Sequence, residues 1–171
     1  MTRHDYLWVL TDNNLIHPNH HGFLSNHSTA TALLHLYDLW IQAIDSGQFS
    51  AALLLDLSAG FDVVSHPILL DKLAMYGLDE LAVSWFRSYV SDRQQCVLVE
   101  SALSDPKPVS FGVPQGSILG PELYNYNSND LFLFVLLQIA NYADDNSPFC
   151  TAETIPHVIN NLEADAKNLL W

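Results

Sequence analysis

A short apolar run that carries one carboxylate is the feature that most constrains the fold of this chain. AALLLDL (51–57) has the length and composition of a β-strand buried on both faces, and such a strand has no natural place for Asp56. Burying a lone carboxylate costs several kcal/mol or forces it to take up a proton. We therefore expect Asp56 to end the strand beside a partner charge or a metal ion.

A second acidic feature lies in the sequence NYADDNSP. We expect residues 138–142 and 147–151 to form a β-hairpin with Asp144 and Asp145 at its turn. A strand-end aspartate that faces such a pair suits Mg²⁺, which takes oxygen ligands and usually binds through one or two carboxylates plus substrate phosphates. The alternative is that Asp-Asp is ordinary turn chemistry and that Asp56 is only a cap. Taken alone, these residues favour that alternative.

Hydrophobic periodicity and chain-breaking residues predict the other elements. Ser28 or Thr29 begins a helix that Gly47 ends, and Pro67 begins a helix that Gly77 ends. Further helices are expected over 79–91, from near Ser117 and over 153–171. A hairpin is also expected, in which the strands QCVLVE (95–100) and VSF (109–111) are joined by the turn SDPKP. The predicted apolar helix faces are Leu33, Leu36, Tyr37, Trp40, Ile41 and Ile44, then Leu81, Trp85, Phe86 and Tyr89, and finally Ile155, Val158, Ile159, Leu162, Ala166 and Leu169. Helices with a mainly antiparallel sheet predict an α+β fold.

The composition favours a folded protein and argues against a protein that binds nucleic acid tightly. The 171 residues are 49% apolar and 15% charged, which suits one domain with a real core. Lys and Arg total 6 against 19 Asp and Glu, a net charge of -13, whereas affinity for a phosphate backbone comes largely from Lys and Arg. Cys96 and Cys150 show neither CxxC spacing nor the density of a disulfide scaffold. Without a secretory signal or an apolar run long enough for a bilayer, we expect a soluble intracellular protein, nuclear or cytoplasmic, and no membrane partner.

The first 27 residues show no clean period and hold five of the eight histidines: His4, His17, His20, His21 and His27. Such a stretch can bind metal, but its histidines have no regular ligand spacing and no cysteine joins them. We interpret residues 1–27 as a partly ordered lead-in and residues 28–171 as a single, incomplete domain.

Five motifs, taken together, resemble the reverse transcriptases of non-LTR (LINE-like) retrotransposons. In chain order they are HHGFLSNHSTATALL, LLLDLSAGFDVVSH, WFRSYVSDRQQCVLV, FGVPQGSILGPELYNYNSNDL and NYADDNSPFC. The resemblance covers about residues 20–171, and GVPQGSILGP followed by YADD, after DLSAGFD, makes it specific. It implies the fingers and palm of a reverse transcriptase, with the fingers beginning within residues 1–27 and with an antiparallel palm sheet packed on helices. It also implies an RNA-directed DNA polymerase reaction, in which a primer 3'-hydroxyl attacks the α-phosphate of a deoxynucleoside triphosphate under the direction of an RNA template.

The resemblance also implies a catalytic centre. Asp56 resembles the first catalytic aspartate, and Asp144 and Asp145 resemble the acidic pair of the second catalytic motif. With the backbone of Leu57, they would hold Mg²⁺, or alternatively Mn²⁺, for two-metal nucleotidyl transfer.

A nucleotide-binding surface follows from the same resemblance, through Ala59, Gly60, Phe61, Gln115 and Gly116. The backbone around Ala59 and Gly60 would meet the triphosphate, and Phe61 falls at the position of the aromatic gate that excludes a 2'-hydroxyl. Gln115 and Gly116 match the loop over the nucleotide and template, which Asp62 is expected to support. Without the motifs, Phe61 would be a core aromatic residue and VPQG an ordinary turn.

Departures from the family pattern leave a second function open. Leu24 and His27 stand where basic residues are expected, and VLLQ (135–138) is apolar where relatives tend to carry charge. Relatives also continue past the position of Trp171 into a thumb, which we expect this chain to lack. We therefore expect weak binding of RNA template, DNA primer and deoxynucleoside triphosphate, and weak or no activity of the isolated chain. The alternative is a noncatalytic retroelement remnant that acts as a scaffold or interaction module. A further alternative, another two-metal phosphotransferase or hydrolase, gives VPQG no role; the oligomeric state is not predicted.

Overall fold

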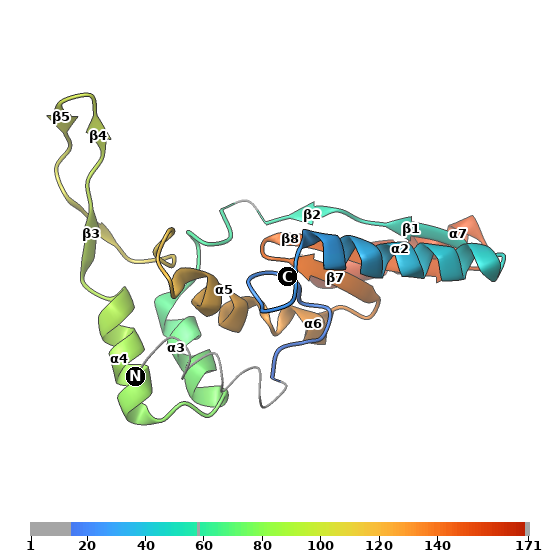
Figure 1. Cartoon of the computed structure of the whole chain (residues 1–171), viewed down its shortest axis with the longest axis horizontal. Helices are drawn as coiled ribbons and strands as arrows, with labels where there is room; N and C mark the ends of the chain where they lie inside the picture. The colour runs from blue at the N-terminus through green and yellow to red at the C-terminus, as the bar shows by residue number, and fades with distance from the viewer. Residues whose placement is uncertain (1–14, 58, 170–171) are drawn as a thin grey trace. The chain divides into compact units, whose positions relative to one another are not determined.

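The chain forms two compact units, and each is described by itself. The computed structural model describes residues 15–57 and 59–169. Of these, residues 59–127 belong to unit 1, and residues 15–57 and 128–169 belong to unit 2 (Figure 1). Helices and strands are mixed along the chain, as the sequence predicts.

Unit 2 is built on a four-stranded sheet whose central strand is β8 (Asp145–Ala152). β7 (Gln138–Tyr142) pairs with one edge of β8, and β1 (Phe49–Ala52) and β2 (Leu55–Asp56) follow one another along the other edge. All of these strand pairs are antiparallel. The predicted hairpin is confirmed, but Asp145 begins β8 instead of lying in the turn.

The prediction that residues 51–57 form one strand buried on both faces is wrong. β1 and β2 lie at the edge of the sheet, where no further strand of the described residues pairs with them, and the side chains of both are exposed or only half-buried. Leu54, between them, is 78% exposed. A short apolar run has the same appearance in an edge strand as in a buried one, because burial depends on what packs against it.

A proline in the central strand separates β1 from β2. The two strands keep one register against β8, in which Ala52 faces Phe149 and Leu55 faces Asn146. Between them, Leu53 donates its backbone N–H to the carbonyl of Pro148 at 2.9 Å, but Pro148 has no N–H to donate in return. One missing hydrogen bond therefore interrupts an otherwise continuous edge strand.

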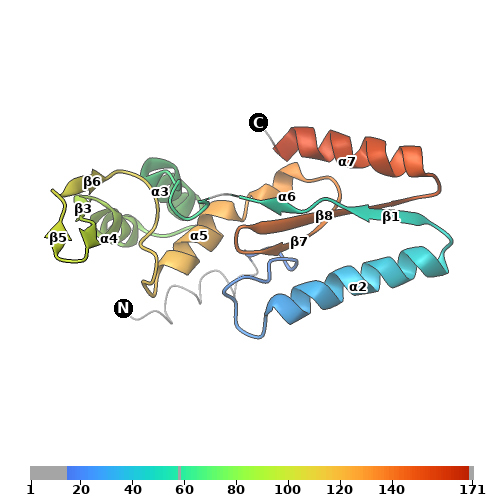
Figure 2. The ribbon, with the colours of Figure 1, turned by 90° about the horizontal axis from the view of Figure 1, so that it is seen from above.

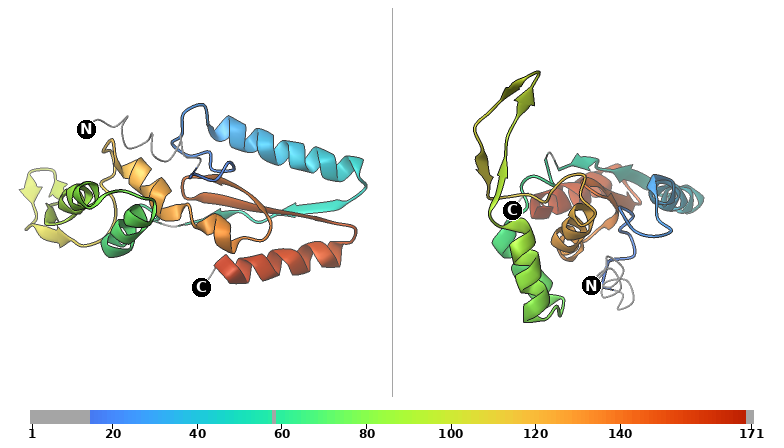
Figure 3. Two further views of the ribbon diagram at one scale, coloured as in Figure 1. Left: turned by 90° about the horizontal axis from the view of Figure 1, so that it is seen from below. Right: turned by 60° about the vertical axis from the view of Figure 1, so that its left-hand side comes forward.

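Two long helices lie on opposite sides of this sheet (Figure 2). α2 (Thr29–Asp45) contacts β1 and β7, and α7 (Ile155–Leu169) contacts β1 and β8. The short helix α6 (Leu131–Phe134) contacts α7. The core under α2 consists of Leu36, Ala140 and Phe149, with Leu39 and Ala52 packed against them. Viewed from the other side, the sheet is again enclosed between the two long helices (Figure 3, left).

The ends of α2 are confirmed, but its predicted buried face is wrong. Ser28 and Thr31 form a capping box, in which the Ser28 hydroxyl accepts from the Thr31 N–H at 3.2 Å, and Gly47 follows the helix with φ of 67°. Of the predicted face only Leu36 is buried, and a narrow stripe of Ala32, Leu36 and Ala43 meets the sheet. Side chains of the predicted face that remain exposed are Leu33, Tyr37, Trp40, Ile41 and Ile44. In α7, likewise, Val158 is buried while Ile155 and Ile159 are exposed.

Unit 1 contains α3 (His66–Met75), α4 (Glu80–Val90) and α5 (Gly120–Ser128), which ends at the boundary between the units. Pro67 lies in the first turn of α3 and Gly77 follows its end, as predicted. The predicted apolar face of α4 is wrong: Phe86 is buried, but Leu81 and Trp85 are exposed. The buried side chains of α3 and α4 are Leu69, Leu70, Leu73, Ala82, Phe86 and Val90.

A long hairpin follows α4 in unit 1 (Figure 3, right). β3 (Arg93–Gln95) pairs with β6 (Lys107–Val109), and β4 (Leu98–Val99) pairs with β5 (Ala102–Leu103). The turn therefore lies at residues 100–101, where Glu100 has φ of 55°, and not at SDPKP as predicted. SDPKP instead runs between β5 and β6 and into β6.

Candidate functional site

A tight turn presents the acidic pair of unit 2. Tyr142 and Asp145 face each other at the ends of β7 and β8, so that only Ala143 and Asp144 form the loop between them. Ala143 has φ of 57°, which a two-residue hairpin loop requires at its first position but which few residues other than glycine adopt. Asp144 is half-buried and Asp145 is exposed.

The register of the sheet places Asp56 beside Asp145. The two residues face each other directly between β2 and β8. Leu53 donates its N–H to the carbonyl of Pro148 in β8, and Leu57, four positions later, donates its N–H to the carbonyl of Asp144, just before β8, at 3.1 Å. Asp56 therefore lies in a non-hydrogen-bonded pair, where opposed Cα atoms are about 4.5 Å apart and the side chains point to the same face.

A cleft of about 370 Å³ adjoins these two carboxylates within unit 2. Asp56, Tyr142 and Asp145 line one side of it, and side chains from the first half of α2 line the other, among them Leu33 and Leu36. The carboxylates thus lie at the margin of an open, partly apolar hollow and remain accessible to solvent.

Histidines and a glycine flank the same hairpin. The backbone of Asn141, in β7, accepts from His21 at 2.8 Å and donates to Asn19 at 3.0 Å. Gly22, which follows His21, lies against the turn, because a Cβ placed on residue 22 would be 3.1 Å from the Cα of Ala143. The segment before α2 is therefore held against the free edge of β7.

Burial affects the titration of these histidines. It lowers the pKa of His17 and, together with neighbouring His27 and His35, that of His21. His20 is completely buried, and burial, reinforced by His21, His17 and His27, lowers its pKa to about 4. His4 lies outside the described residues.

Two loops come together in unit 1. Val113 donates its N–H to the carbonyl of Phe61 at 2.8 Å, and the amide of Gln115 donates to a carboxylate oxygen of Asp62 at 2.7 Å. This contact is of the supporting kind expected of Asp62. The half-buried ring of Phe61 stacks on Tyr124 of α5, with 4.1 Å between ring centroids and 16° between ring planes.

The predicted nucleotide-binding residues all lie in these loops. Ala59 is exposed with φ of 59°, Gly60 is buried, and Gln115 and Gly116 are exposed. Gly116 has φ of 75°, and a Cβ there would meet nothing within 4 Å. A positive φ with open space beside it suits a loop that a ligand approaches closely.

The predicted site residues therefore form one group in each unit. Unit 2 brings Asp56 next to Asp145, with Asp144 one residue away and Leu57 bonded to it. Unit 1 brings Phe61 into the same set of loops as Gln115 and Gly116. Within residues 15–57 and 59–169, no group of three or more His, Cys, Asp or Glu side chains is arranged to hold a metal ion.

Sequence reasoning missed Tyr124, Asn141 and Asn146. Tyr124 lies eight positions after Gly116 on a helix, and nothing in the sequence marks it as the partner of Phe61. The two asparagines could have been found from the sequence. Asn141 is three positions before Asp144 and Asn146 is one position after Asp145, so a hairpin with a two-residue turn places them opposite each other.

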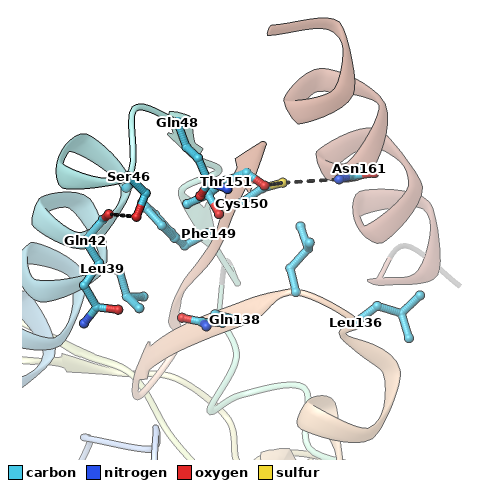
Figure 4. A pocket seen from close by; sticks show the side chains of 12 residues that line it. Leu39, Gln42, Ser46, Gln48, Leu136, Gln138, Phe149, Cys150, Thr151 and Asn161 are labelled. Atoms are coloured by element: carbon cyan, nitrogen blue, oxygen red, sulfur yellow. Dashed lines mark hydrogen bonds between the residues drawn. The ribbon is translucent and has the colours of Figure 1, made fainter. Parts of the chain in front are cut away.

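A second cleft, of about 340 Å³, lies at the other end of β8 (Figure 4). Its lining includes Gln42 of α2, Gln138 of β7, Cys150 of β8 and Asn161 of α7. Cys150 is buried, and its sulfur lies 3.6 Å from the amide nitrogen of Asn161. None of the described residues that line this cleft is charged.

No helix within the described residues is both long and apolar enough to cross a lipid bilayer.

Comparison with known proteins identifies the family of this chain. The family model described as "Reverse transcriptase (RNA-dependent DNA polymerase)" matches residues 4–169. The chain is similar to the RNA-directed DNA polymerase from mobile element jockey of Drosophila melanogaster, at 29% identity over 83% of this chain and 16% of the relative. It is similar to the jockey polymerase of Drosophila funebris at 31% identity, over 72% of this chain and 14% of the relative. A third relative is the "Probable RNA-directed DNA polymerase from transposon X-element" of Drosophila melanogaster, at 34% identity over 76% of this chain and 15% of the relative.

The chain spans about one seventh of the length of these curated relatives, between 14% and 16%. Because the family model matches nearly the whole chain, this protein belongs to the reverse transcriptase (RNA-dependent DNA polymerase) family.

Proposed function

We propose that this chain is the fingers and palm portion of an RNA-directed DNA polymerase, with Asp56, Asp144 and Asp145 as its metal-binding carboxylates. The observation that carries the proposal is the register that sets Asp56 opposite Asp145, one residue from the YADD turn, in a member of this family. Partners are an RNA template, a DNA primer and a deoxynucleoside triphosphate.

The carboxylates fit Mg²⁺ better than a metal ion that prefers nitrogen or sulfur ligands. All the donors are oxygens: the side chains of Asp56, Asp144 and Asp145, and the carbonyl of Leu57. Mg²⁺ keeps several waters and binds through one or two carboxylates plus substrate phosphates, so it does not need a cage of three protein side chains. Two opposed and exposed aspartates satisfy this requirement, and Mn²⁺, which also prefers oxygen ligands, is the alternative.

The reaction is the transfer of a nucleotidyl group. The primer 3'-oxygen forms a bond to the α-phosphorus, the bond to the β-phosphate oxygen breaks, pyrophosphate leaves, and the proton of the 3'-hydroxyl passes to solvent. Bound divalent metal lowers the pKa of the attacking hydroxyl and offsets charge on the leaving oxygen. The protein positions the reactants, which is the main contribution that such a site makes to rate.

Selection of the nucleotide is assigned to unit 1. The exposed backbone of Ala59 and the turn at Gly60 would contact the triphosphate, and Gln115 and Gly116 would lie over the base and template. The ring of Phe61 would exclude a ribose 2'-hydroxyl by occupying its space. Its stacking on Tyr124 supports this role, because a gate works only if its ring is held in place.

Mutation of the carboxylates tests the metal site directly. We expect Asp56→Asn and Asp145→Asn each to weaken Mn²⁺ binding by at least about tenfold, measured by electron paramagnetic resonance, because each removes one anionic ligand. The matched control is Asp38→Asn, which alters an exposed carboxylate on α2. Unchanged affinity in both site variants would show that the proposed metal site does not exist.

A primer-extension assay on an RNA template measures the level of activity. We expect the chain to be weak or inactive, since its net charge of -13 and the absence of basic residues at Leu24 and His27 disfavour contact with phosphates. Robust Mg²⁺-dependent synthesis would contradict this expectation and would strengthen the assignment as a working polymerase.

A noncatalytic scaffold is the second candidate. The observation that favours it is the acidic composition together with large apolar side chains exposed along α2, among them Leu33, Tyr37 and Ile44. A chain that binds neither Mn²⁺ nor primer-template, yet is stably folded, would support this candidate over the polymerase.

A further inference from the structure

Two buried asparagines lie beneath the acidic turn. Asn141 of β7 and Asn146 of β8 face each other directly, and they are 1% and 2% exposed. Along the hairpin, this pair is the next one after Tyr142 and Asp145, moving away from the turn. Because successive residues of a strand point to opposite faces, the asparagine side chains lie on the opposite face of the hairpin from the carboxylate of Asp145. Burying two carboxamides is costly unless they are hydrogen-bonded, so their contacts are informative.

Their side chains hold the two residues of the turn. The amide of Asn141 donates to the carbonyl of Ala143 and to the side-chain oxygen of Asn146, both at 2.8 Å. The amide of Asn146 donates to the carbonyl of Asp144 at 3.0 Å. Each carbonyl in the loop is therefore bonded to a side chain from one of the two strands.

The carbonyl of Asp144 connects this network to the other side of the metal site. It also accepts the N–H of Leu57 at 3.1 Å, directly after Asp56. A shift of the turn would therefore change the distance between Asp144 and the strand that carries Asp56.

Gly22 supports the turn from the side of the preceding segment. A Cβ on residue 22 would meet the backbone nitrogen of Ala143 and lie 3.1 Å from its Cα, so no larger residue fits without a backbone shift. Asn141, Asn146 and Gly22 thus hold the turn in one conformation. In this conformation Ala143 has φ of 57°, which a residue other than glycine rarely adopts without support from its surroundings.

We propose that Asn141, Asn146 and Gly22 are positioning residues that fix the backbone of Asp144 and Asp145 for metal binding. The proposal rests on the metal site described under the proposed function. Carboxylate ligands need accurate placement, and removing groups that orient metal ligands typically lowers metal affinity about 10- to 100-fold.

The test compares Asn141→Leu and Asn146→Leu with Asn161→Leu in the full 171-residue chain. Leucine has nearly the shape of asparagine but makes no hydrogen bonds. Asn161 also has a side-chain contact to β8, at Cys150, but it lies far along the strand from the turn, so its variant is the matched control.

Amide hydrogen exchange reports whether the asparagines hold the turn. We expect the Leu57 amide, which is bonded to Asp144, to exchange about tenfold faster or more in both site variants. The Val158 amide in α7, which bonds to Thr154 at 3.2 Å, should keep its rate. If a leucine variant fails to fold, Asn146→Ala replaces it, because a small side chain leaves space for water beside the carbonyl of Asp144.

Mn²⁺ affinity, measured by electron paramagnetic resonance, separates positioning from a merely structural role. We expect it to fall about 10- to 100-fold in the site variants and to be unchanged in Asn161→Leu. Faster exchange with unchanged Mn²⁺ affinity would overturn the proposal, and so would an unchanged exchange rate at Leu57. Loss of affinity in the asparagine variants while Asp145→Asn still binds Mn²⁺ would instead contradict the proposed metal site.

Discussion

One aromatic contact in unit 1 helps to hold the ring of the proposed sugar gate. Phe61 is half-buried and lies in a turn between β2 and α3. Tyr124 is 2% exposed on α5 and stacks on Phe61 with 4.1 Å between centroids. Such aromatic pairs contribute about 0.5–1.5 kcal/mol beyond their burial, which is enough to favour one ring orientation.

Replacing Tyr124 tests this at the scale of a residue. We expect Tyr124→Leu to reduce the preference for deoxynucleotides over ribonucleotides by about 2- to 10-fold, because Phe61 loses the ring that fixes it. Tyr124→Phe keeps the ring and should retain the preference. The measurement is the ratio of kcat/KM for the two nucleotides in single-nucleotide incorporation; an unchanged ratio in Tyr124→Leu would show that Phe61 is held by other contacts.

At the scale of elements, a close backbone crossing joins the two loops of unit 1. Gly112 donates its N–H to the carbonyl of Val64 at 2.8 Å, and its own carbonyl is 2.8 Å from Nε2 of His66. A Cβ at residue 112 would lie 2.8–3.0 Å from the backbone of Asp62. Glycine is required there both by space and by φ of 85°.

Two glycine substitutions separate the effect of space from the effect of φ. Gly77 has a similar φ of 91° but nothing within 4 Å of an added Cβ. We expect Gly77→Ala to destabilise the protein by about 1–2 kcal/mol, through backbone strain alone. Gly112→Ala should cost roughly 1–3 kcal/mol more, because the methyl group also displaces Asp62. Urea unfolding followed by circular dichroism gives both values, and equal losses would mean that the crossing relaxes freely.

At the scale of the whole molecule, buried histidines make stability depend on pH. The ring of His20 is fully buried, and neither nitrogen has a hydrogen-bond partner among the described residues. Its pKa is lowered to about 4 by burial and by the neighbouring His21, His17 and His27. The folded chain therefore binds this proton less readily than the unfolded chain, whose histidines have a pKa near 6.5.

The lowered pKa of His20 means that the folded state should lose stability as the pH falls. Because the folded-state pKa is the lower one, the contribution of His20 is complete above about pH 6.5 and is lost as the pH falls toward about 4. The loss is on the order of 3 kcal/mol over that window. We expect the free energy of unfolding in urea to fall between pH 7 and pH 5 and to fall less in His20→Leu. A variant with the same pH dependence as the original chain would exclude His20 as a cause.

The family, the ends of α2 and α3 and the acidic hairpin could be predicted from short stretches of the sequence. Ser28, Gly47, Pro67 and Gly77 act on backbone groups within about one turn, so their effect can be predicted from neighbours along the chain. The motifs around Asp56 and YADD likewise carry their meaning in short stretches, although the roles that they imply remain predictions.

Which side chains are buried, and which residues face one another, depends on how distant segments of the chain pack together. Leu33 and Leu54 are as apolar as Leu36, yet they are exposed because the sheet in unit 2 covers only a narrow stripe of α2 and leaves its own edge open. The opposition of Asp56 and Asp145 depends on the register between two strands, in which residues 89 positions apart in the sequence face each other. Burial and register are properties of surfaces formed by distant segments, and no local pattern contains them.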